Sequence, residues 1–244
     1  MTLYSPKDLT ALLEHHNFFF KKNLGQNFLI NEGVAQKIAN ASFETLSHKR
    51  PSLVIEIGPG AGSLTYQLAK RFDHVVALEI DPHLIPVLNE SLAGLSNIDV
   101  VHTDALKYDF SQLKEAFPQH ETVVCSNLPY YITSELIMRL LECRLEITSL
   151  TVLIQKEAAA RFSAQPNSSE YGAITAVASY YAKANKLFTV GPTNFIPRPK
   201  VDSAVLQLIP HIEKEISVIS EKMFFKVIHA AFANRRKTLS NKTR

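Results

Sequence analysis

Short apolar runs alternate with segments of helical periodicity from residue 53 onward. The runs that predict buried strands are 53–57, 74–80, 98–101, 122–126 and 150–154, and the helical patterns cover 64–72, 82–93, 134–142 and 157–162. Strands that alternate with helices of this length predict βαβ units. We therefore expect an α/β, Rossmann-like fold, in which helices cover both faces of a mostly parallel sheet.

The pattern differs at the two ends of the chain. Residues 8–20 are rich in apolar side chains and predict a helix, whose phenylalanines at 18–20 are expected to pack rather than bind a ligand. Prolines at 192, 197 and 199 interrupt regular structure, and then residues 201–209 predict a late strand and 221–234 a helix. We expect a main domain with an N-terminal helical extension over residues 1–205 and a small helical domain over 206–244.

Composition narrows the class of protein. The chain has 244 residues, of which 46% are hydrophobic, so it can bury a sizeable core. We expect no membrane span, because no apolar stretch approaches the roughly 20 residues that a bilayer requires. We also expect no secretory signal, since the N-terminus lacks a basic region followed by an apolar one. Cys125 and Cys143 have neither metal-ligand nor disulfide spacing, which predicts reduced thiols in a cytoplasmic protein without a metal site.

Charge is distributed unevenly along the chain. Residues 51–150 carry six basic and thirteen acidic side chains, whereas residues 151–244 carry fourteen basic and six acidic ones. An acidic middle is compatible with a small-molecule site, and a basic C-terminal third is suited to a polyanion such as RNA. A solvated basic face remains the alternative at this point.

Glycines gather where a cofactor would bind. Three of the eight glycines, Gly58, Gly60 and Gly62, lie within five residues directly after the strand at 53–57. Glycines in this position let a ligand approach the backbone. A dinucleotide motif would need a glycine where Ser63 stands, and the Gly-Lys-Ser/Thr of a phosphate loop is absent. The remaining hypothesis is a nucleoside cofactor without phosphate, S-adenosylmethionine.

Two carboxylates follow the next two strands and favour the same cofactor. Glu79 ends the strand at 74–80, about 20 residues past the glycines, where a carboxylate can accept hydrogen bonds from both ribose hydroxyls. Asp104 comes just after the strand at 98–101 and is placed to bind the adenine amino group. Either residue could instead cap a strand end or form a turn, and for Asp104 this alternative is nearly as strong.

A second motif, Asn127-Leu128-Pro129-Tyr130, follows the strand at 122–126. We expect the Asn127 side-chain oxygen and the Leu128 carbonyl to accept both hydrogens of an adenine N6 amine, which aims its lone pair at the methyl carbon. Pro129 biases Leu128 toward an extended conformation. Tyr130 would stack on the base, which contributes about 1–3 kcal/mol. A general base is not required, so catalysis would come from positioning and electrostatics.

Four motifs in order now resemble a known family. They are 21–29 (KKNLGQNFL), 56–62 (EIGPGAG), 127–131 (NLPYY) and 197–205 (PRPKVDSAV), and together they are similar to KsgA-type ribosomal RNA adenine N6,N6-dimethyltransferases over about residues 10–241. The resemblance implies S-adenosylmethionine as cofactor. It implies as substrate two adjacent adenines near the 3′ end of small-subunit (16S) rRNA, which become N6,N6-dimethyladenines during maturation of the small ribosomal subunit.

The family's functional residues carry over onto this chain. The resemblance implies cofactor contacts from Asn27, Leu29, Gly58, Glu79, Asp104 and Asn127. It also places Phe195 over the target base, opposite Tyr130, whereas the residue taken alone predicts a place in the core. RNA contacts are expected from Lys156, for which a plain helix-surface lysine is the alternative, and from Arg235, Arg236 and Lys237. The expected partners are small-subunit rRNA and the assembling subunit, which a monomer would bind.

One departure and two alternatives accompany the resemblance. Family members usually continue some tens of residues further, so the helical C-terminal domain is expected to be truncated at Arg244. The first alternative is the antibiotic-resistance type that dimethylates large-subunit rRNA; Leu128 and Asp202-Ser203-Ala204 favour the small-subunit type. The second is a non-catalytic RNA-binding assembly factor, which the intact motif at 127–130 disfavours.

Overall fold

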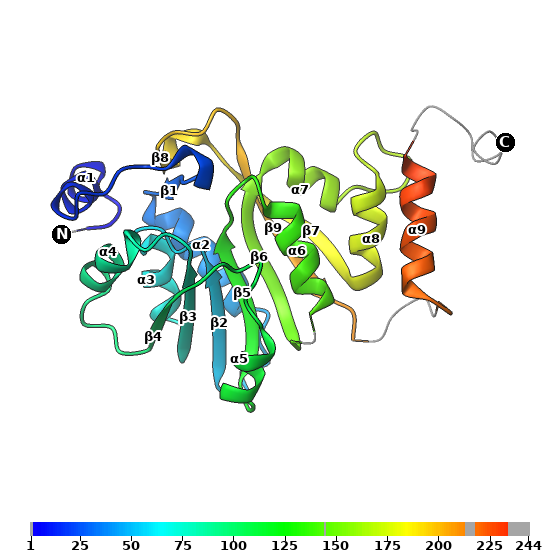
Figure 1. Cartoon of the computed structure of the whole chain (residues 1–244), viewed down its shortest axis with the longest axis horizontal. Helices are drawn as coiled ribbons and strands as arrows, with labels where there is room; N and C mark the ends of the chain where they lie inside the picture. Colours follow the sequence, from blue (N-terminus) through cyan, green and yellow to red (C-terminus); the bar gives the residue numbers. More distant parts are fainter. Residues whose placement is uncertain (1, 144, 213–217, 234–244) are drawn as a thin grey trace.

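A seven-stranded sheet forms the centre of the protein in the computed structural model, which describes residues 2–143, 145–212 and 218–233 (Figure 1). Its spatial order is β4 (Ile98–His102), β3 (His74–Glu79), β2 (Ser52–Ile57), β5 (Glu121–Asn127), β6 (Ile147–Gln155), β9 (Ser203–Pro210) and β7 (Ala182–Val190). The first five strands are parallel, and β9 runs antiparallel to both of its neighbours. The expected α/β architecture with a mostly parallel sheet is confirmed.

The central strands form because their side chains can be buried on both faces. All six residues of β2 are buried, and so are six of the seven in β5. Strands covered on both faces read as continuous apolar runs, which is the pattern that predicted them. From β2 the chain continues to β3, which lies on one side of β2. It later returns to form β5, which lies on the other side. The carboxyl ends of β2 and β5 therefore border the crevice where ligands bind in such sheets.

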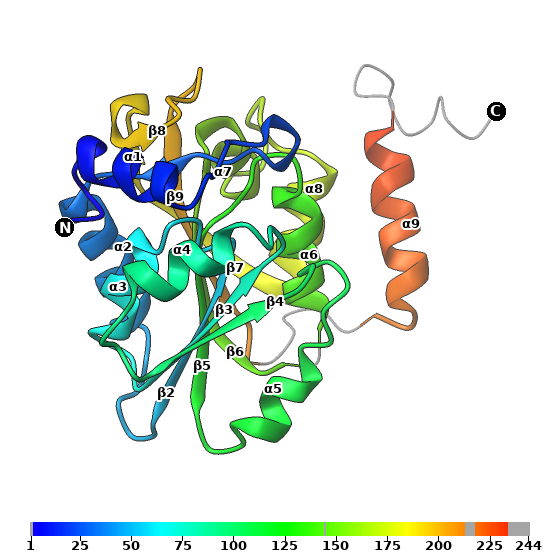
Figure 2. The same ribbon diagram turned by 60° about the vertical axis from the view of Figure 1, so that its left-hand side comes forward.

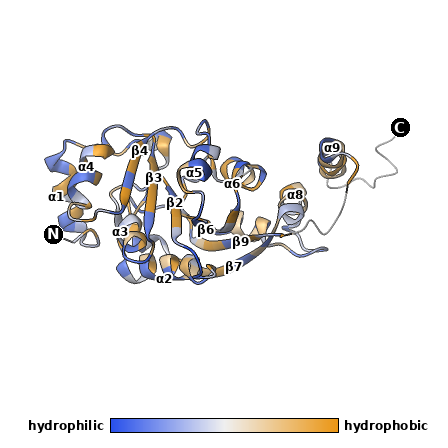
Figure 3. Cartoon of the chain, turned by 90° about the horizontal axis from the view of Figure 1, so that it is seen from below, coloured by the Kyte–Doolittle hydropathy of each residue, from blue (hydrophilic) through white to orange (hydrophobic). Residues whose placement is uncertain are grey.

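Helices cover the two faces of the sheet, as Figures 1 and 3 show. One face carries α2 (Glu32–Phe43) and α3 (Ser63–Ala69). The other carries α5 (Ser111–Ala116), α6 (Thr133–Glu142), α7 (Lys156–Phe162) and α8 (Ala173–Tyr181). Each layer buries its own apolar cluster against the sheet, so the hydrophobic core has two halves.

The N-terminal segment lies across the carboxyl edge of the sheet (Figure 2). It contains α1 (Pro6–His15), the 3-10 helix η1 (Lys22–Leu24) and β1 (Phe28–Leu29), and β1 pairs with β8 (Phe195–Ile196). Helix α1 packs through leucines on α4 (Leu84–Ser91). The helix expected over 8–20 ends early, because Asn17 has a positive φ of 50°. Phe18 is buried as expected, but Phe19 is 79% exposed.

Several elements carry too weak a pattern to be predicted. Helix α2 buries Ala35, Ile38, Ala39 and Ser42, which have helical spacing but mostly small side chains. Strand β7 exposes Lys183 and Lys186. Lysines suit its place at the sheet edge, because they discourage further strand pairing. The other unpredicted elements are α5, α8, β1, β8, η1 and η2 (Pro192–Asn194).

After β9 the described chain ends with one helix, α9 (Glu221–Phe232). Strand β9 extends to Pro210 within the main sheet, so a domain boundary after residue 205 would cut this strand. Helix α9 rests on α8 through Tyr180, whose ring contacts Phe224 and Phe225. None of the residues of α9 is buried. Within the described ranges, no helix is long and apolar enough to cross a membrane.

Candidate active site

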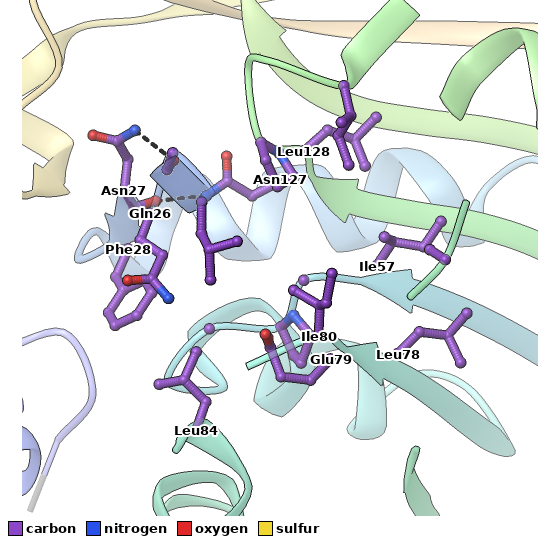
Figure 4. A pocket seen from close by; sticks show the side chains of 18 of the residues that line it. Gln26, Asn27, Phe28, Ile57, Leu78, Glu79, Ile80, Leu84, Asn127 and Leu128 are labelled. Carbon is purple, nitrogen blue, oxygen red and sulfur yellow. Dashed lines mark hydrogen bonds between the residues drawn. The ribbon is translucent and has the colours of Figure 1, made fainter. Parts of the chain in front are cut away.

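A cavity of about 220 Å³ opens at the carboxyl ends of β2, β3 and β5, against the N-terminal segment. It is lined by most of the residues that the sequence singled out: Asn27, Leu29, Gly58, Glu79, Asp104, Asn127, Leu128, Pro129 and Tyr130. Figure 4 shows Gln26, Asn27 and Phe28 on one side, Glu79 and Ile80 opposite, and Asn127 beside Asn27. Tertiary structure thus brings together five sequence segments that are separated along the chain.

The glycine loop forms the floor of this cavity. The Gly58 amide donates to the Leu78 carbonyl at 2.9 Å, which turns the loop over the end of β3. Gly60 has a φ of +61°, and a Cβ added there would lie 2.8 Å from the Phe28 ring. Both the backbone conformation and the close approach of Phe28 therefore require glycine at this position. The loop leaves space for a ligand that a side chain would fill.

Glu79 is the buried carboxylate of the cavity wall, and its residue is only 3% exposed. Burial raises its pKa to about 7, although backbone amides of Asp81, Gly60 and Ile80 act in the opposite direction. Its Oε1 accepts from the Asp81 amide at 2.8 Å. A carboxylate held in this way would gain most from ligand groups that donate hydrogen bonds, such as two ribose hydroxyls.

Asp104 faces the same cavity but is already engaged locally. Its Oδ1 accepts from the Leu106 amide at 3.0 Å, and its Oδ2 lies 3.7 Å from Lys107 Nζ. The turn role that the sequence left open is therefore present. Asp104 also lies on the cavity wall, and its binding of the adenine amino group stays a prediction.

The residues that line the cavity fit a nucleoside cofactor that carries positive charge. None of the described residues around the cavity is a lysine or an arginine, whereas Glu79 and Asp104 are both acidic. A phosphate group would lack a cationic partner here, but the sulfonium of S-adenosylmethionine would find favourable charge. Ile57, Ile80 and Leu106 supply apolar wall for an adenine ring. The residues present therefore fit this cofactor.

Asn127 ends β5 with its side chain held in one orientation. The Nδ2 group donates to the Asn27 backbone carbonyl at 2.8 Å, so the Oδ1 atom points away from that carbonyl (Figure 4). Tyr130 is held separately, because its hydroxyl lies 2.7 Å from Ser203 Oγ at the start of β9. The site therefore presents a fixed acceptor beside a fixed aromatic ring.

Phe195 lies in the core, which is the place that the residue taken alone predicts. Its side chain is 2% exposed and packs with Leu29, Val190 and Val205, and it is not among the cavity-lining residues. It belongs to β8, which pairs with β1. The place over the target base, opposite Tyr130, which the resemblance implies, stays a prediction.

Two sets of expected RNA contacts lie elsewhere. Lys156 begins α7, and its Nζ lies 3.2 Å from Asp202 Oδ2 along a polar groove beside the cavity. That groove is also lined by Arg161 and Lys200. Arg235, Arg236 and Lys237 lie outside the described residues.

Sequence reasoning missed several residues that line the cavity. Gln26 and Phe28 come from the N-terminal segment, and Tyr131 follows the predicted motif directly. Ile80 was assigned to the end of a strand, but it lies beyond β3 and is 42% exposed. The signal available in the sequence was the place of Ile80 directly after Glu79, at the carboxyl end of a predicted strand.

Comparisons with known proteins agree with this geometry. The profile of the family described as "Ribosomal RNA adenine dimethylase" matches residues 17–244. The chain belongs to this family. It is a methyltransferase of rRNA adenine that uses S-adenosylmethionine, so the predicted family, enzyme class and cofactor are confirmed.

Members of the dimethylase family from other organisms cover most of this chain. "Ribosomal RNA small subunit methyltransferase A" of Shouchella clausii is 46% identical over 239 residues, which are 97% of this chain and 79% of that protein. The protein of the same name from Oceanobacillus iheyensis is 44% identical over 97% of this chain and 80% of its own.

Two solved structures of related enzymes share the fold. A dimethyladenosine transferase from Plasmodium falciparum superposes with a TM-score of 0.74 and 31% identity, covering 88% of this chain and 74% of its own. The 23S rRNA methyltransferase ErmE gives a TM-score of 0.72 and 27% identity, covering 89% and 83%. The Rossmann-like methyltransferase fold predicted from the sequence is therefore confirmed.

Proposed function

We propose that this protein dimethylates N6 of two adjacent adenines near the 3′ end of small-subunit rRNA and thereby contributes to maturation of the small ribosomal subunit. The relatives at 44–46% identity are named for the small subunit, which supports this choice of substrate. The observation that carries the chemistry is the orientation of Asn127, whose amide nitrogen is already bound by Asn27.

An acceptor at this position addresses the central difficulty of the reaction. The lone pair of an exocyclic adenine amine is delocalised into the ring, and it attacks only when it is turned toward the electrophile. Asn127 Oδ1 and the Leu128 carbonyl would accept the two N6 hydrogens and so direct the lone pair. Tyr130 would hold the base by stacking, an interaction of about 1–3 kcal/mol. These residues act by positioning, without a general base.

The residues of the cavity wall opposite Asn127 would bind the cofactor. Glu79 would accept hydrogen bonds from the ribose, Asp104 would bind the adenine amino group, and the loop at Gly58 would admit the amino-acid portion. Asn27 and Leu29 would close the pocket from the N-terminal side. S-adenosylmethionine supplies an electrophilic methyl group bound to a sulfonium, which is a strong leaving group.

RNA would be held outside the cavity. The groove that contains Lys156, Arg161 and Lys200 adjoins Tyr130 through Ser203, so it would take the phosphates that flank the flipped base. The basic C-terminal third, including Arg235, Arg236 and Lys237, would extend this contact as part of a C-terminal RNA-binding domain. We further propose that the protein acts in the cytoplasm as a monomer on the assembling small subunit.

The second candidate is dimethylation of large-subunit rRNA, which the similarity to ErmE keeps open. To decide between them, purified protein and radiolabelled S-adenosylmethionine are incubated with small and large subunits from a strain that lacks the modification. We expect label in the small subunit and a primer-extension stop at two adjacent adenines near its 3′ end. Label confined to the large subunit would refute the proposed substrate.

Two variants test the chemistry and exclude a purely RNA-binding role. Asn127→Ala is expected to lose methyl transfer by at least about a hundredfold while retaining binding to the subunit, because it removes a positioned acceptor. Asn185→Ala, at an exposed position of β7, serves as the control and should retain wild-type turnover. Unchanged turnover in Asn127→Ala would contradict the assigned role.

A further inference from the structure

Residues 21–30, which we name the strap, cross the mouth of the cavity and form its N-terminal wall. The strap is short of regular structure, since η1 and β1 contribute only three and two residues. Backbone hydrogen bonds hold it at its end, where β1 pairs with β8, and the rest of the strap depends on side-chain contacts with the protein. One of these contacts involves a residue that no motif had singled out, Asp81.

Asp81 is a buried carboxylate that accepts hydrogen bonds from two side chains of the strap. Lys21 Nζ donates to its Oδ1 at 2.8 Å, and Gln26 Nε2 donates to its Oδ2 at 3.1 Å. The Asp81 side chain is 0% exposed, and the Lys21 backbone amide also donates to Gln26 Oε1 at 2.7 Å. Burial raises the pKa of Asp81, but hydrogen bonds from Lys21, His83 and Gln26 outweigh it and hold the pKa below its ordinary value. The carboxylate therefore stays charged and bound to the strap.

The same residue is joined to the cofactor wall. The backbone amide of Asp81 donates to Glu79 Oε1 at 2.8 Å, while Asp81 Oδ1 also accepts from the His83 amide at the start of α4. Glu79 and the strap are thus fixed relative to each other through one residue. A displacement of Asp81 would move both walls of the cavity.

The other end of this connection is the carboxamide of Asn127. Its Nδ2 donates to the carbonyl of Asn27, which is part of the strap and follows Gln26 directly (Figure 4). An asparagine amide can rotate by half a turn and exchange its donor and acceptor ends. The strap carbonyl can pair only with the NH₂ group, so it selects the orientation in which Oδ1 is turned away from the strap.

We propose that Lys21 and Asp81 are positioning residues for methyl transfer: they hold the strap in the place where the Asn27 carbonyl sets the polarity of the Asn127 amide. This inference rests on the proposed role of Asn127 as the acceptor for the target amine. Without the Lys21–Asp81 pair, the strap loosens and the Asn127 amide rotates freely. In half of its orientations the NH₂ group of Asn127 would then face the target amine, whose own N–H groups need an acceptor.

The test uses three variants of the full-length protein. Lys21→Met breaks the ion pair by removing its cation, which is the partly exposed partner, and Lys21→Arg retains a cation at that position. Lys37→Met removes an exposed lysine from α2 and serves as the control. Single-turnover methyl transfer to unmethylated small subunits is measured at saturating cofactor. In parallel, hydrogen exchange of the Asn127 side-chain amide is followed by NMR on protein labelled with ¹⁵N-asparagine, with the signal assigned from Asn127→Ala.

We expect Lys21→Met to slow the single-turnover rate by about tenfold to a hundredfold, the effect of misplacing a catalytic group by about 1 Å. The Asn127 amide should exchange faster in this variant, whereas Lys21→Arg should restore both properties and Lys37→Met should alter neither. Wild-type rate and exchange in Lys21→Met would overturn the inference, and so would a slow rate with unchanged exchange. Because exchange is measured without RNA, the inference can fail or hold separately from the proposed substrate.

Asp81→Asn provides a second variant from the buried side of the pair. It keeps the size of the side chain and one acceptor oxygen, but it removes the charge that binds Lys21. Asp81→Asn also disturbs a second contact, because its NH₂ group replaces an oxygen that accepts from Gln26 or His83. The double variant with Lys21→Met should therefore be no slower than Asp81→Asn alone, since both substitutions break the Lys21–Asp81 contact. Additive losses in the double variant would contradict a shared role.

Discussion

Binding of the cofactor should depend on pH through Glu79. Burial raises the pKa of this carboxyl to about 7, while a ribose diol donates hydrogen bonds to the ionised form. Ligand binding therefore favours the deprotonated state, and affinity should fall as the pH falls below about 7. Asp81 and Asp104 also lie near this carboxyl, and Asp81 raises its pKa further.

The size of the effect follows from the two pKa values. If the ligand returns Glu79 to its ordinary pKa of 4.5, the apparent affinity between pH 8 and pH 5.5 should fall by about 30-fold, close to 2 kcal/mol. A smaller decrease would mean that the neutral acid still accepts part of the ribose contact. The direction is the same in either case.

S-adenosylhomocysteine is the ligand of choice for this assay, because its own groups do not titrate in this range and no methyl transfer occurs. Calorimetric titrations from pH 5.5 to pH 8 would compare wild type with Glu79→Gln, which should bind more weakly at pH 8 and show little dependence on pH. Glu121→Gln is the control, since Glu121 is also a buried carboxyl, but it lies at the start of β5 and does not line the cavity. An equally steep pH dependence in Glu79→Gln would refute the assignment.

Two further predictions concern stability. Burial raises the pKa of Glu56 to about 8, so the folded state disfavours its ionisation and loses stability as the pH rises from about 4.5 to 8; Glu56→Gln should therefore raise Tm at pH 9 more than at pH 5, and an equal change at both would contradict this. Gly60→Ala should destabilise the fold by about 1–3 kcal/mol in urea, because its Cβ would meet Phe28 at a positive φ. Gly94→Ala also has a positive φ but meets nothing within 4 Å, so a loss equal to that of Gly60→Ala would refute the contact argument.

The sequence predicted the parts of the fold whose pattern is strong within a short window. The strands β2 and β5 are continuous apolar runs because they are buried on both faces, and the glycine loop and the motif at Asn127 directly follow them. Parallel strands bring their carboxyl ends to one edge of a sheet, so the meeting of these two motifs could be expected. Helix α2 was missed because small residues such as Ala35 and Ala39 mark its buried face only weakly.

Side-chain environment was decided by tertiary structure. Taken alone, Phe195 predicted a core residue, whereas the resemblance implied a place over the target base. The structure buries its ring in the core, where β8 pairs with β1. Only the folded chain could show this environment, because the burial of an aromatic ring depends on the strands around it. The sequence analysis assigned no role to Asp81, and only the folded chain places it against Lys21 and Gln26.

The sequence by itself thus determined the alternation of the central strands with helices, the loop that admits the cofactor and the identity of the acceptor motif. These features depend on neighbouring residues along the chain. Tertiary structure decided the pKa of Glu79 and the orientation of the Asn127 amide. Both properties arise from contacts among residues that lie far apart in sequence, since desolvation and hydrogen-bond geometry depend on what surrounds a group in space.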